Sequence, residues 1–377
     1  MKLFSPFRIK SIKMSNRIVR SATYEKMADE DGFVTEQLTD LYIKLAKGGV
    51  GLIITGNTLV HVSGRSAPKM LCIHNDFYIE GLKKLTEAIH KVGSQIVIQL
   101  THGGRQCSRL FLGGRDPVAP SAVYEPVFKV MPRELTNEEI WELIESFGKA
   151  AKRAKEAGFD GVQLHGAHGY LINQFLSPYT NKRKDYWGGD EERRFHFLEE
   201  VYLNIRDNVG YDYPIMIKLN ACDFIEGGLT LEESLRIAKR LESLGIDAIE
   251  ISGGIVESKP ELRPVRVGID SPDKEAYFRE FSREFKKNLK TPIILVGGIR
   301  SRAVAEDILQ KEDADLISLS RPLIREPNLP KKWMKGKEKA DCISCNGCLQ
   351  FMKLDYVRCV QLEKRKTKSN KEVQVDT

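Results

Sequence analysis

The 377-residue sequence has no uninterrupted apolar run of the roughly 18 residues that a membrane-spanning helix requires. Its first residues, Met-Lys-Leu-Phe-Ser-Pro, also lack the apolar stretch of a secretory signal. Apolar residues make up 41% and charged residues 29% of the chain, which are globular averages and exclude a largely disordered protein. These absences predict a cytoplasmic protein that does not act within a membrane.

A strong excess of one charge sign is also missing. The chain has 59 Lys and Arg against 52 Asp and Glu, a net charge of +7. Nearly all of this excess lies after residue 330, in a tail that includes Lys364, Arg365 and Lys366. Such charge runs are usually solvated, and no recognised nucleic-acid motif accompanies this one. We therefore expect no nucleic-acid partner.

Cysteine is scarce outside one short segment. Cys72, Cys107 and Cys222 are scattered, while the other four cysteines crowd together near the end of the sequence. In a cytoplasmic protein such a cluster indicates a metal site rather than disulfides. The spacing C-x₂-C-x₂-C-x₁₀-C suits a [4Fe–4S] cluster, with a Cys₄ zinc site and unmetallated thiols as alternatives. The candidate ligands are Cys342, Cys345, Cys348 and Cys359.

Eight short β-branched runs alternate with helical segments between residues 1 and 330. Most runs are continuously apolar, which is typical of parallel strands buried on both faces. The pattern predicts an α/β fold, a (β/α)₈ TIM barrel. A doubly wound sheet is the alternative, but no glycine fingerprint follows the first run. The expected strands span residues 16–22, 51–56, 95–100, 158–165, 214–220, 248–253, 292–297 and 315–320.

Three further segments refine this organisation. Thr136 and Glu139 form a capping box that predicts the start of a helix over residues 138–157. Residues 111–133 are rich in proline and include a Gly-Gly pair, so we expect an insertion that partly covers the barrel mouth. Residues 331–377 form a C-terminal extension that carries the four cysteines and the basic tail, after a barrel domain of residues 1–330.

Polar residues and glycines fall where the expected strands end, and barrel enzymes carry their reactive groups at those ends. After the seventh and eighth strands come Gly297, Gly298, Ser320 and Arg321, which suit a phosphate held by backbone N–H groups and one cation. The remaining strand ends contribute Ser21, Ala22, Thr23, Gly56, Gln99, His165, His168 and Lys218.

Two stretches of the sequence resemble the Old Yellow Enzyme family of FMN-dependent NAD(P)H oxidoreductases. Residues 98–105 read IQLTHGGR, and residues 165–178 read HGAHGYLINQFLSP before continuing into NKRKDYWGG. The resemblance covers residues 1–330. It implies an enzyme that binds FMN across the barrel mouth and takes electrons from NAD(P)H.

The resemblance also implies how FMN is held. The flavin is expected over the end of the first strand, next to Ser21, Ala22 and Thr23, with Gly56 leaving room for the ring. The Gln99 amide both donates and accepts, which suits the pyrimidine edge. Lys218 resembles the cation beside flavin N1, which stabilises the anionic reduced flavin. Family members often have Arg there, so the tuning of the potential differs. The phosphate is expected at Gly297, Gly298, Ser320 and Arg321.

Three residues of the longer stretch resemble the family's catalytic set. His165 and His168 match the pair that hydrogen-bonds the oxygen of an α,β-unsaturated carbonyl or carboxyl compound. Tyr170 matches the acid that protonates the α-carbon after hydride transfer, a role suited to a phenol that stays protonated at neutral pH. Taken alone, His-x-x-His is also a zinc-ligand fragment. Tyr170 alone could be a packed aromatic residue.

The four-cysteine pattern resembles the iron–sulfur branch of the same family, which includes 2,4-dienoyl-CoA reductase and trimethylamine dehydrogenase. The spacing before Cys359 is shorter than in those relatives. They also carry an FAD- and pyridine-nucleotide-binding half, which these 377 residues do not contain. Either NAD(P)H reduces FMN directly, or an electron-transfer protein supplies electrons through the cluster.

Three functions follow, in order of preference. The first is an ene-reductase that reduces an activated C=C bond of a small unsaturated substrate. The second is an iron–sulfur flavoprotein dehydrogenase or demethylase that exchanges electrons with a partner protein. The third is a flavin-binding interaction protein without turnover. The sequence favours neither NADH nor NADPH and is compatible with a homo-oligomer.

Overall fold

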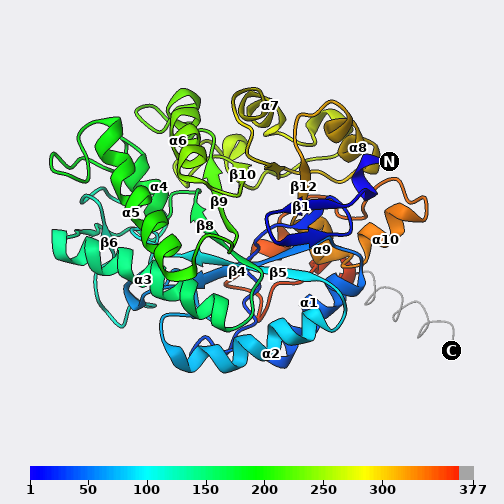
Figure 1. The fold of residues 1–377 in the computed structure, drawn as a ribbon, viewed down its shortest axis with the longest axis horizontal. Helices are drawn as coiled ribbons and strands as arrows, with labels where there is room; N and C mark the ends of the chain where they lie inside the picture. The colour runs from blue at the N-terminus through cyan, green and yellow to red at the C-terminus, as the bar shows by residue number, and fades with distance from the viewer. Residues whose placement is uncertain (365–377) are drawn as a thin grey trace.

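A closed barrel of parallel strands forms the centre of the computed structural model, which describes residues 1–364. The strands pair in the order β10-β11-β12-β3-β4-β5-β8-β9, and β9 closes the ring on β10 (Figure 1). This confirms the predicted (β/α)₈ barrel and excludes the doubly wound sheet, which has open edges. The strands are β3 (Ile18–Arg20), β4 (Leu52–Leu59), β5 (Gln95–Thr101), β8 (Gly161–Gly166), β9 (Ile215–Asn220), β10 (Ala248–Ser252), β11 (Ile293–Leu295) and β12 (Leu316–Leu319).

Helices follow each barrel strand. The capping box predicted at Thr136 and Glu139 is present, and Thr230 and Glu233 form a second one. The helices are α1 (Glu36–Lys47), α2 (Ile79–His90), α3 (Asn137–Glu156), α4 (Leu171–Leu176), α5 (Glu191–Val209), α6 (Leu231–Leu244), α7 (Arg279–Asn288), α8 (Arg302–Gln310), α9 (Arg321–Arg325) and α10 (Leu329–Met334). Short 3₁₀ turns lie at Lys2–Phe4, Val62–Gly64, Asp76–Tyr78, Pro260–Leu262, Pro272–Lys274 and Gly347–Leu349.

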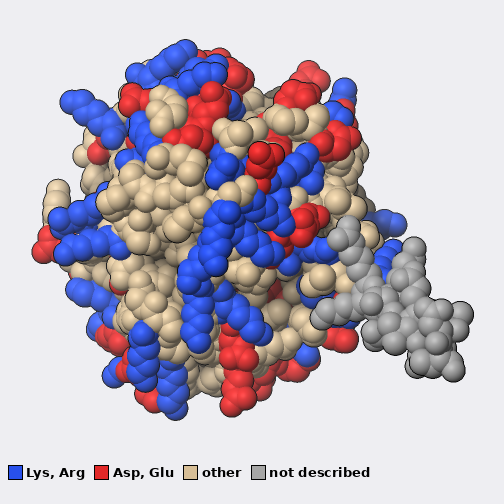
Figure 2. All heavy atoms as spheres, turned by 90° about the vertical axis from the view of Figure 1, so that its right-hand side faces the viewer, with Lys and Arg blue, Asp and Glu red and all other residues tan. Residues whose placement is uncertain are grey.

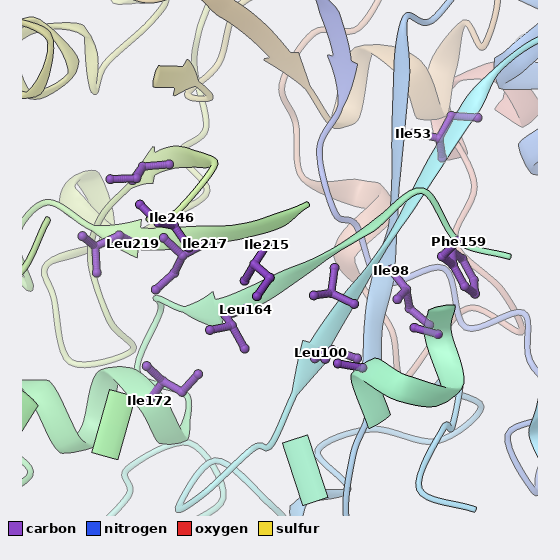
Figure 3. Packing of buried hydrophobic residues seen from close by; sticks show 14 of the residues in the cluster. Ile53, Ile98, Leu100, Phe159, Leu164, Ile172, Ile215, Ile217, Leu219 and Ile246 are labelled. Carbon is purple, nitrogen blue, oxygen red and sulfur yellow. The ribbon is translucent and has the colours of Figure 1, made fainter. Parts of the chain in front are cut away.

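Side chains alternate along each strand between the helices and the barrel interior. On β9, Ile215, Ile217 and Leu219 belong to the large apolar cluster between strands and helices (Figure 3). Met216 belongs to a separate cluster inside the barrel, and Lys218 lies on the same side of the strand. A largely apolar strand thus contributes to two different cores.

A hairpin closes the N-terminal end of the barrel. It consists of β1 (Phe7–Ile9) and β2 (Ile12–Met14), which pair antiparallel. This hairpin is not among the predicted strands, because strands of three residues are too short to show a period. Apolar residues of the hairpin pack with inward-facing apolar residues of the barrel strands, and we call this cluster the floor of the barrel. Its buried members are Ile9, Ile12, Met14, Val19, Leu52, Ile54, Val97, Met216, Ala248, Ile294 and Leu316.

The predicted insertion after β5 contains two short paired strands, β6 (Val118–Ala119) and β7 (Arg133–Glu134). Arg183, from the NKRKDYWGG stretch, donates hydrogen bonds to the carbonyl oxygens of Pro120 and Leu135 at 3.1 and 2.7 Å. That stretch of sequence therefore anchors the insertion. That the insertion partly covers the barrel mouth stays a prediction.

The C-terminal extension returns to the barrel mouth. Lys26 Nζ, just after β3, donates to the carbonyl oxygens of Phe351 and Leu354 at 2.8 and 2.7 Å. The Val357 amide donates to the Glu25 carbonyl oxygen at 2.8 Å. The four-cysteine segment therefore lies against the residues that follow β3. The division at residue 330 stays a prediction, and Arg365 and Lys366 of the basic tail lie outside the described residues.

The surface combines both signs of charge. Figure 2 shows Lys and Arg gathered in a band down the middle of one face, with Asp and Glu beside it. Cations thus cluster on the described part of the chain as well as in the tail, which the charge count alone did not indicate. Within residues 1–364, no helix is both long and apolar enough to cross a membrane.

Candidate active site at the barrel mouth

A buried polar layer lies directly above the apolar floor. Lys218 Nζ donates to Ser21 Oγ at 3.0 Å and lies 3.4 Å from a carboxylate oxygen of Glu250. Gln99 Nε2 donates to Gln163 Oε1 at 2.8 Å. The structure thus brings three predicted cofactor residues into one network with Glu250 and Gln163, which sequence reasoning missed. The available signal was a polar residue at an inward position of an otherwise apolar strand.

One pocket opens above this layer and gathers most of the predicted cofactor residues. It lies at the C-terminal ends of the strands, where barrel enzymes carry their sites. The predicted residues that line it are Ser21, Ala22, His168, Lys218, Gly298, Ser320 and Arg321. Lining residues that the sequence analysis missed include Ser252, Tyr277, Arg300, Ser318 and Ser344.

The end of the pocket near β11 and β12 carries uncompensated positive charge. Arg300 and Arg321 are both buried, and neither has an ion pair among residues 1–364. Arg300 Nε also has no hydrogen-bond partner there. Gly298 has φ +73° and passes so close to Tyr277 that a Cβ would lie 2.7 Å from its ring. Two buried cations beside a glycine turn fit a phosphate group.

The other four predicted cofactor residues, Thr23, Gly56, Gln99 and Gly297, are not in the lining of this pocket. Thr23 Oγ1 lies 2.8 Å from Ser320 Oγ, which links the end of β3 to the pocket. At Gly56 a Cβ would lie 2.2 Å from the Glu25 carboxylate, and the Gly56 amide donates to the Tyr42 hydroxyl at 3.1 Å. The missing side chain at Gly56 therefore makes room for Glu25 in this structure.

The predicted catalytic residues meet at the end of β8. The ring centres of His165 and His168 are 5.1 Å apart, and those of His165 and Tyr170 are 4.6 Å apart. His168 Nε2 lies 2.7 Å from Ser252 Oγ. His165 Nδ1 is buried and has no hydrogen-bond partner among the described residues. That nitrogen can hydrogen-bond a ligand.

Burial decides the protonation of this group. Burial, helped by the nearby Lys218 charge, lowers the pKa of His168 to about 3. Burial, His168 and Lys218 together hold the pKa of His165 well below its usual value. Burial raises the pKa of Tyr170. At neutral pH the site therefore holds two neutral imidazoles and a protonated phenol.

Side chains of β9 and α4 form hydrogen bonds with the turn that carries these groups. His168 and Gly169 both have positive φ, at +62° and +77°. Asn220 Oδ1 accepts from the His168 amide at 3.1 Å, and Asn173 Oδ1 accepts from the Gly169 amide at 2.6 Å. Gln174 Nε2 donates to the Gly169 carbonyl oxygen at 2.6 Å. Asn173 and Gln174, both in the HGAHGYLINQFLSP stretch, thus hold a strained turn in place.

The cysteines of the extension lie beside the pocket. Arg321, which lines it, donates a 2.5 Å hydrogen bond to Asn346 Oδ1, between Cys345 and Cys348. Burial, with smaller contributions from Cys342 and Cys345 and against the opposing charge of Arg321, raises the pKa of Cys348 to about 11. Arg325 donates to Cys359 Sγ at 3.4 Å. Within the described residues, no three His, Cys, Asp or Glu side chains are placed to hold a metal ion. The iron–sulfur cluster stays a prediction.

A closed barrel with an anion pocket beside neutral histidines and a tyrosine is the arrangement of a cofactor-dependent barrel enzyme. The model of the NADH:flavin oxidoreductase / NADH oxidase family matches residues 2–340. The chain belongs to this family. The membership confirms the resemblance on which the predicted site was based.

The chain is also similar to individual known flavin oxidoreductases and their relatives. The chain is 44% identical over 352 residues to a protein named NADH oxidase from Thermoanaerobacter brockii, covering 92% of this chain and 53% of the relative. A solved 2-naphthoyl-CoA reductase superposes with a TM-score of 0.88 at 32% identity, covering 94% of this chain and 56% of that one. An Old Yellow Enzyme homologue from Zymomonas mobilis gives 0.79 at 30% identity, covering 91% and 95%. The chain thus spans about half the length of the first two proteins.

The buried neutral histidines predict an acid-sensitive fold. Because the folded pKa of His168 is about 3, against 6.5 for a free imidazole, the unfolded chain binds more protons below pH 6.5. Stability should therefore fall as pH drops from about 6.5 towards 3, with His168 contributing up to about 1.4 kcal/mol per pH unit. We expect His168→Gln to flatten this slope, measured by urea unfolding across that range.

Tyr170→Phe is the matched control, because it alters the same site without removing a group that titrates in acid. It should keep the wild-type slope. An equally steep slope in His168→Gln would show that His168 is not held neutral by the fold.

Proposed function

We propose that this chain is an FMN-dependent NAD(P)H oxidoreductase of the ene-reductase type. Its substrate is an α,β-unsaturated carbonyl or carboxyl compound, whose activated C=C bond is reduced. The observation that carries the proposal is the group His165, His168 and Tyr170, gathered beside a pocket lined by two buried arginines. The family match supports the flavin and the nicotinamide donor.

The residues of the pocket fit FMN. The buried arginines Arg300 and Arg321 and the turn at Gly297 and Gly298 would hold the phosphate. Lys218 would lie at the flavin edge, where its charge favours the anionic reduced form, and Gln99 would bind the pyrimidine edge. Ser21, Ala22 and Thr23 would contact the ring. Bound FMN supplies hydride transfer between nicotinamide and substrate.

The chain's own side chains orient and protonate the substrate. Neutral His165 and His168 each have one N–H to donate, and together they bind the carbonyl or carboxylate oxygen. This withdraws electron density from the C=C bond, so that the β-carbon accepts hydride. The Tyr170 hydroxyl then gives its proton to the α-carbon and is reprotonated from solvent. The saturated product leaves with one hydride and one proton added.

A second candidate is an iron–sulfur flavoprotein dehydrogenase or demethylase that exchanges electrons with a partner protein. The hydrogen bond from Arg321 to Asn346 favours it, because it joins the pocket to the loop that contains Cys345 and Cys348. The ligands of a [4Fe–4S] cluster would be Cys342, Cys345, Cys348 and Cys359. Such a cluster supplies single-electron transfer.

Turnover of NADH or NADPH with cyclohexenone or an enoate tests the first candidate directly. We expect NAD(P)H-dependent reduction of the C=C bond by the FMN-loaded protein. Reduction by a low-potential donor protein but by neither nucleotide would instead favour the second candidate. FMN binding with no turnover in either assay would favour a flavin-binding interaction protein.

Substitutions in the catalytic group should separate its two roles. His165→Ala is expected to keep FMN but to weaken binding of substrate and of phenol ligands. Loss of one hydrogen bond to a developing oxyanion lowers the rate by about 10²–10³. Tyr170→Phe should bind phenols normally and slow only the oxidative half-reaction, measured by stopped-flow absorbance. Wild-type turnover by Tyr170→Phe under proton-limited conditions would mean that another acid donates the proton.

The cluster proposal predicts a spectroscopic loss confined to the extension. Anaerobically prepared wild-type protein should contain iron and sulfide and show broad visible absorbance beneath the flavin bands. Cys345→Ser should lose this absorbance and the iron yet retain FMN, because the barrel holds the flavin pocket. Cys222→Ser, which changes a cysteine outside the extension, should retain both. Reconstituted wild-type protein without iron or sulfide would rule the cluster out.

A further inference from the structure

Glu250 on β10 is a charged residue inside the barrel with four polar partners. Its side chain is fully buried. One carboxylate oxygen accepts from Ser21 Oγ at 2.7 Å and Ser318 Oγ at 2.8 Å. The other accepts from Gln163 Nε2 at 2.9 Å and lies 3.4 Å from Lys218 Nζ. From this geometry we propose that Glu250 is a positioning residue that fixes Lys218 and Gln99 and lowers the reduction potential of the flavin.

The network indicates an ionised carboxylate. An ammonium and an amide N–H can only donate, so Lys218 and Gln163 both require an acceptor at Glu250. Ser21 Oγ already accepts from Lys218, so its own proton points to Glu250. Burying such a pair rarely stabilises a fold more than apolar packing would. Its position beneath the cofactor pocket therefore suggests a functional reason.

Glu250 also orients Gln99 through Gln163. Because Gln163 Nε2 donates to Glu250, Gln163 Oε1 is turned towards Gln99 and accepts from Gln99 Nε2 at 2.8 Å. One N–H of Gln99 is thus committed inside the barrel. Its second N–H and its carbonyl oxygen remain for the pyrimidine edge. One carboxylate therefore sets the orientation of two predicted flavin-binding side chains.

The charge of Glu250 opposes that of Lys218. Charges in a buried site interact more strongly than charges in water, so the carboxylate offsets part of the positive field that Lys218 directs at the pocket. That field is the feature that favours an anionic reduced flavin. Neutralising Glu250 while keeping Lys218 should therefore favour the reduced form, which raises the midpoint potential.

The inference rests on the proposed FMN function, and its test measures FMN binding and midpoint potential rather than turnover. Glu250→Gln should tighten the binding of reduced FMN relative to oxidised FMN on the order of tenfold, so that the midpoint potential rises. Lys218→Met should shift it the opposite way. The double variant should fall between the two single variants, because both opposing charges are gone.

Two further variants separate charge from packing. Glu250→Asp keeps the charge but withdraws it by one methylene, so it should raise the potential by less than Glu250→Gln. Met216→Leu alters the packing of the apolar cluster inside the barrel, two residues before Lys218, without changing any charge, and its potential should stay near the wild-type value. If Glu250→Gln does not fold, the comparison of Glu250→Asp with Met216→Leu decides.

The outcomes are distinguishable. Wild-type protein that binds no FMN would refute the proposed function itself. FMN-loaded Glu250→Gln and Glu250→Asp with an unchanged or lower midpoint potential would overturn the role of Glu250 while leaving the proposed function intact. Equal shifts in Glu250→Asp and Met216→Leu would also overturn it, because the effect would then come from packing rather than charge.

Discussion

Closure of the barrel is the constraint on which the rest of this structure depends. It forces every second side chain of each strand into a narrow interior that must be filled. The hairpin β1–β2 and the first inward residues fill the lower part with apolar groups. The next inward positions hold the buried side chains of Lys218, Glu250, Gln99 and Gln163, which satisfy one another. The polar layer under the pocket follows from that geometry.

The chemistry of the site depends on burial more than on any single contact. Burial keeps both His165 and His168 neutral and Tyr170 protonated, so the site can donate hydrogen bonds and one proton without adding charge. The turn that presents them adopts positive φ at His168 and is maintained by Asn173 and neighbouring amides. Strain at that turn is tolerated because hydrogen bonds from side chains of β9 and α4 fix it.

The extension shows how a short segment reaches a site built by the barrel. Lys26 holds the carbonyl oxygens of Phe351 and Leu354, and Arg321 holds Asn346. These contacts bring the four-cysteine segment, residues 342–359, to the pocket, and within that segment the regular structure is one short 3₁₀ turn. A charge change in this segment would act on Arg321, which also lines the pocket.

The sequence by itself determined the eight strands, the capping box at Thr136 and the stretch that carries His165, His168 and Tyr170, because each depends on residues close together in the chain. Only the tertiary structure decided the hairpin floor, the burial of Arg300 in the pocket lining and the partnership of Lys218 with Glu250. It also showed that Gly56 makes room for Glu25. These features join residues distant in the chain, and their pairing is set by strand register around the closed barrel, which no local pattern encodes.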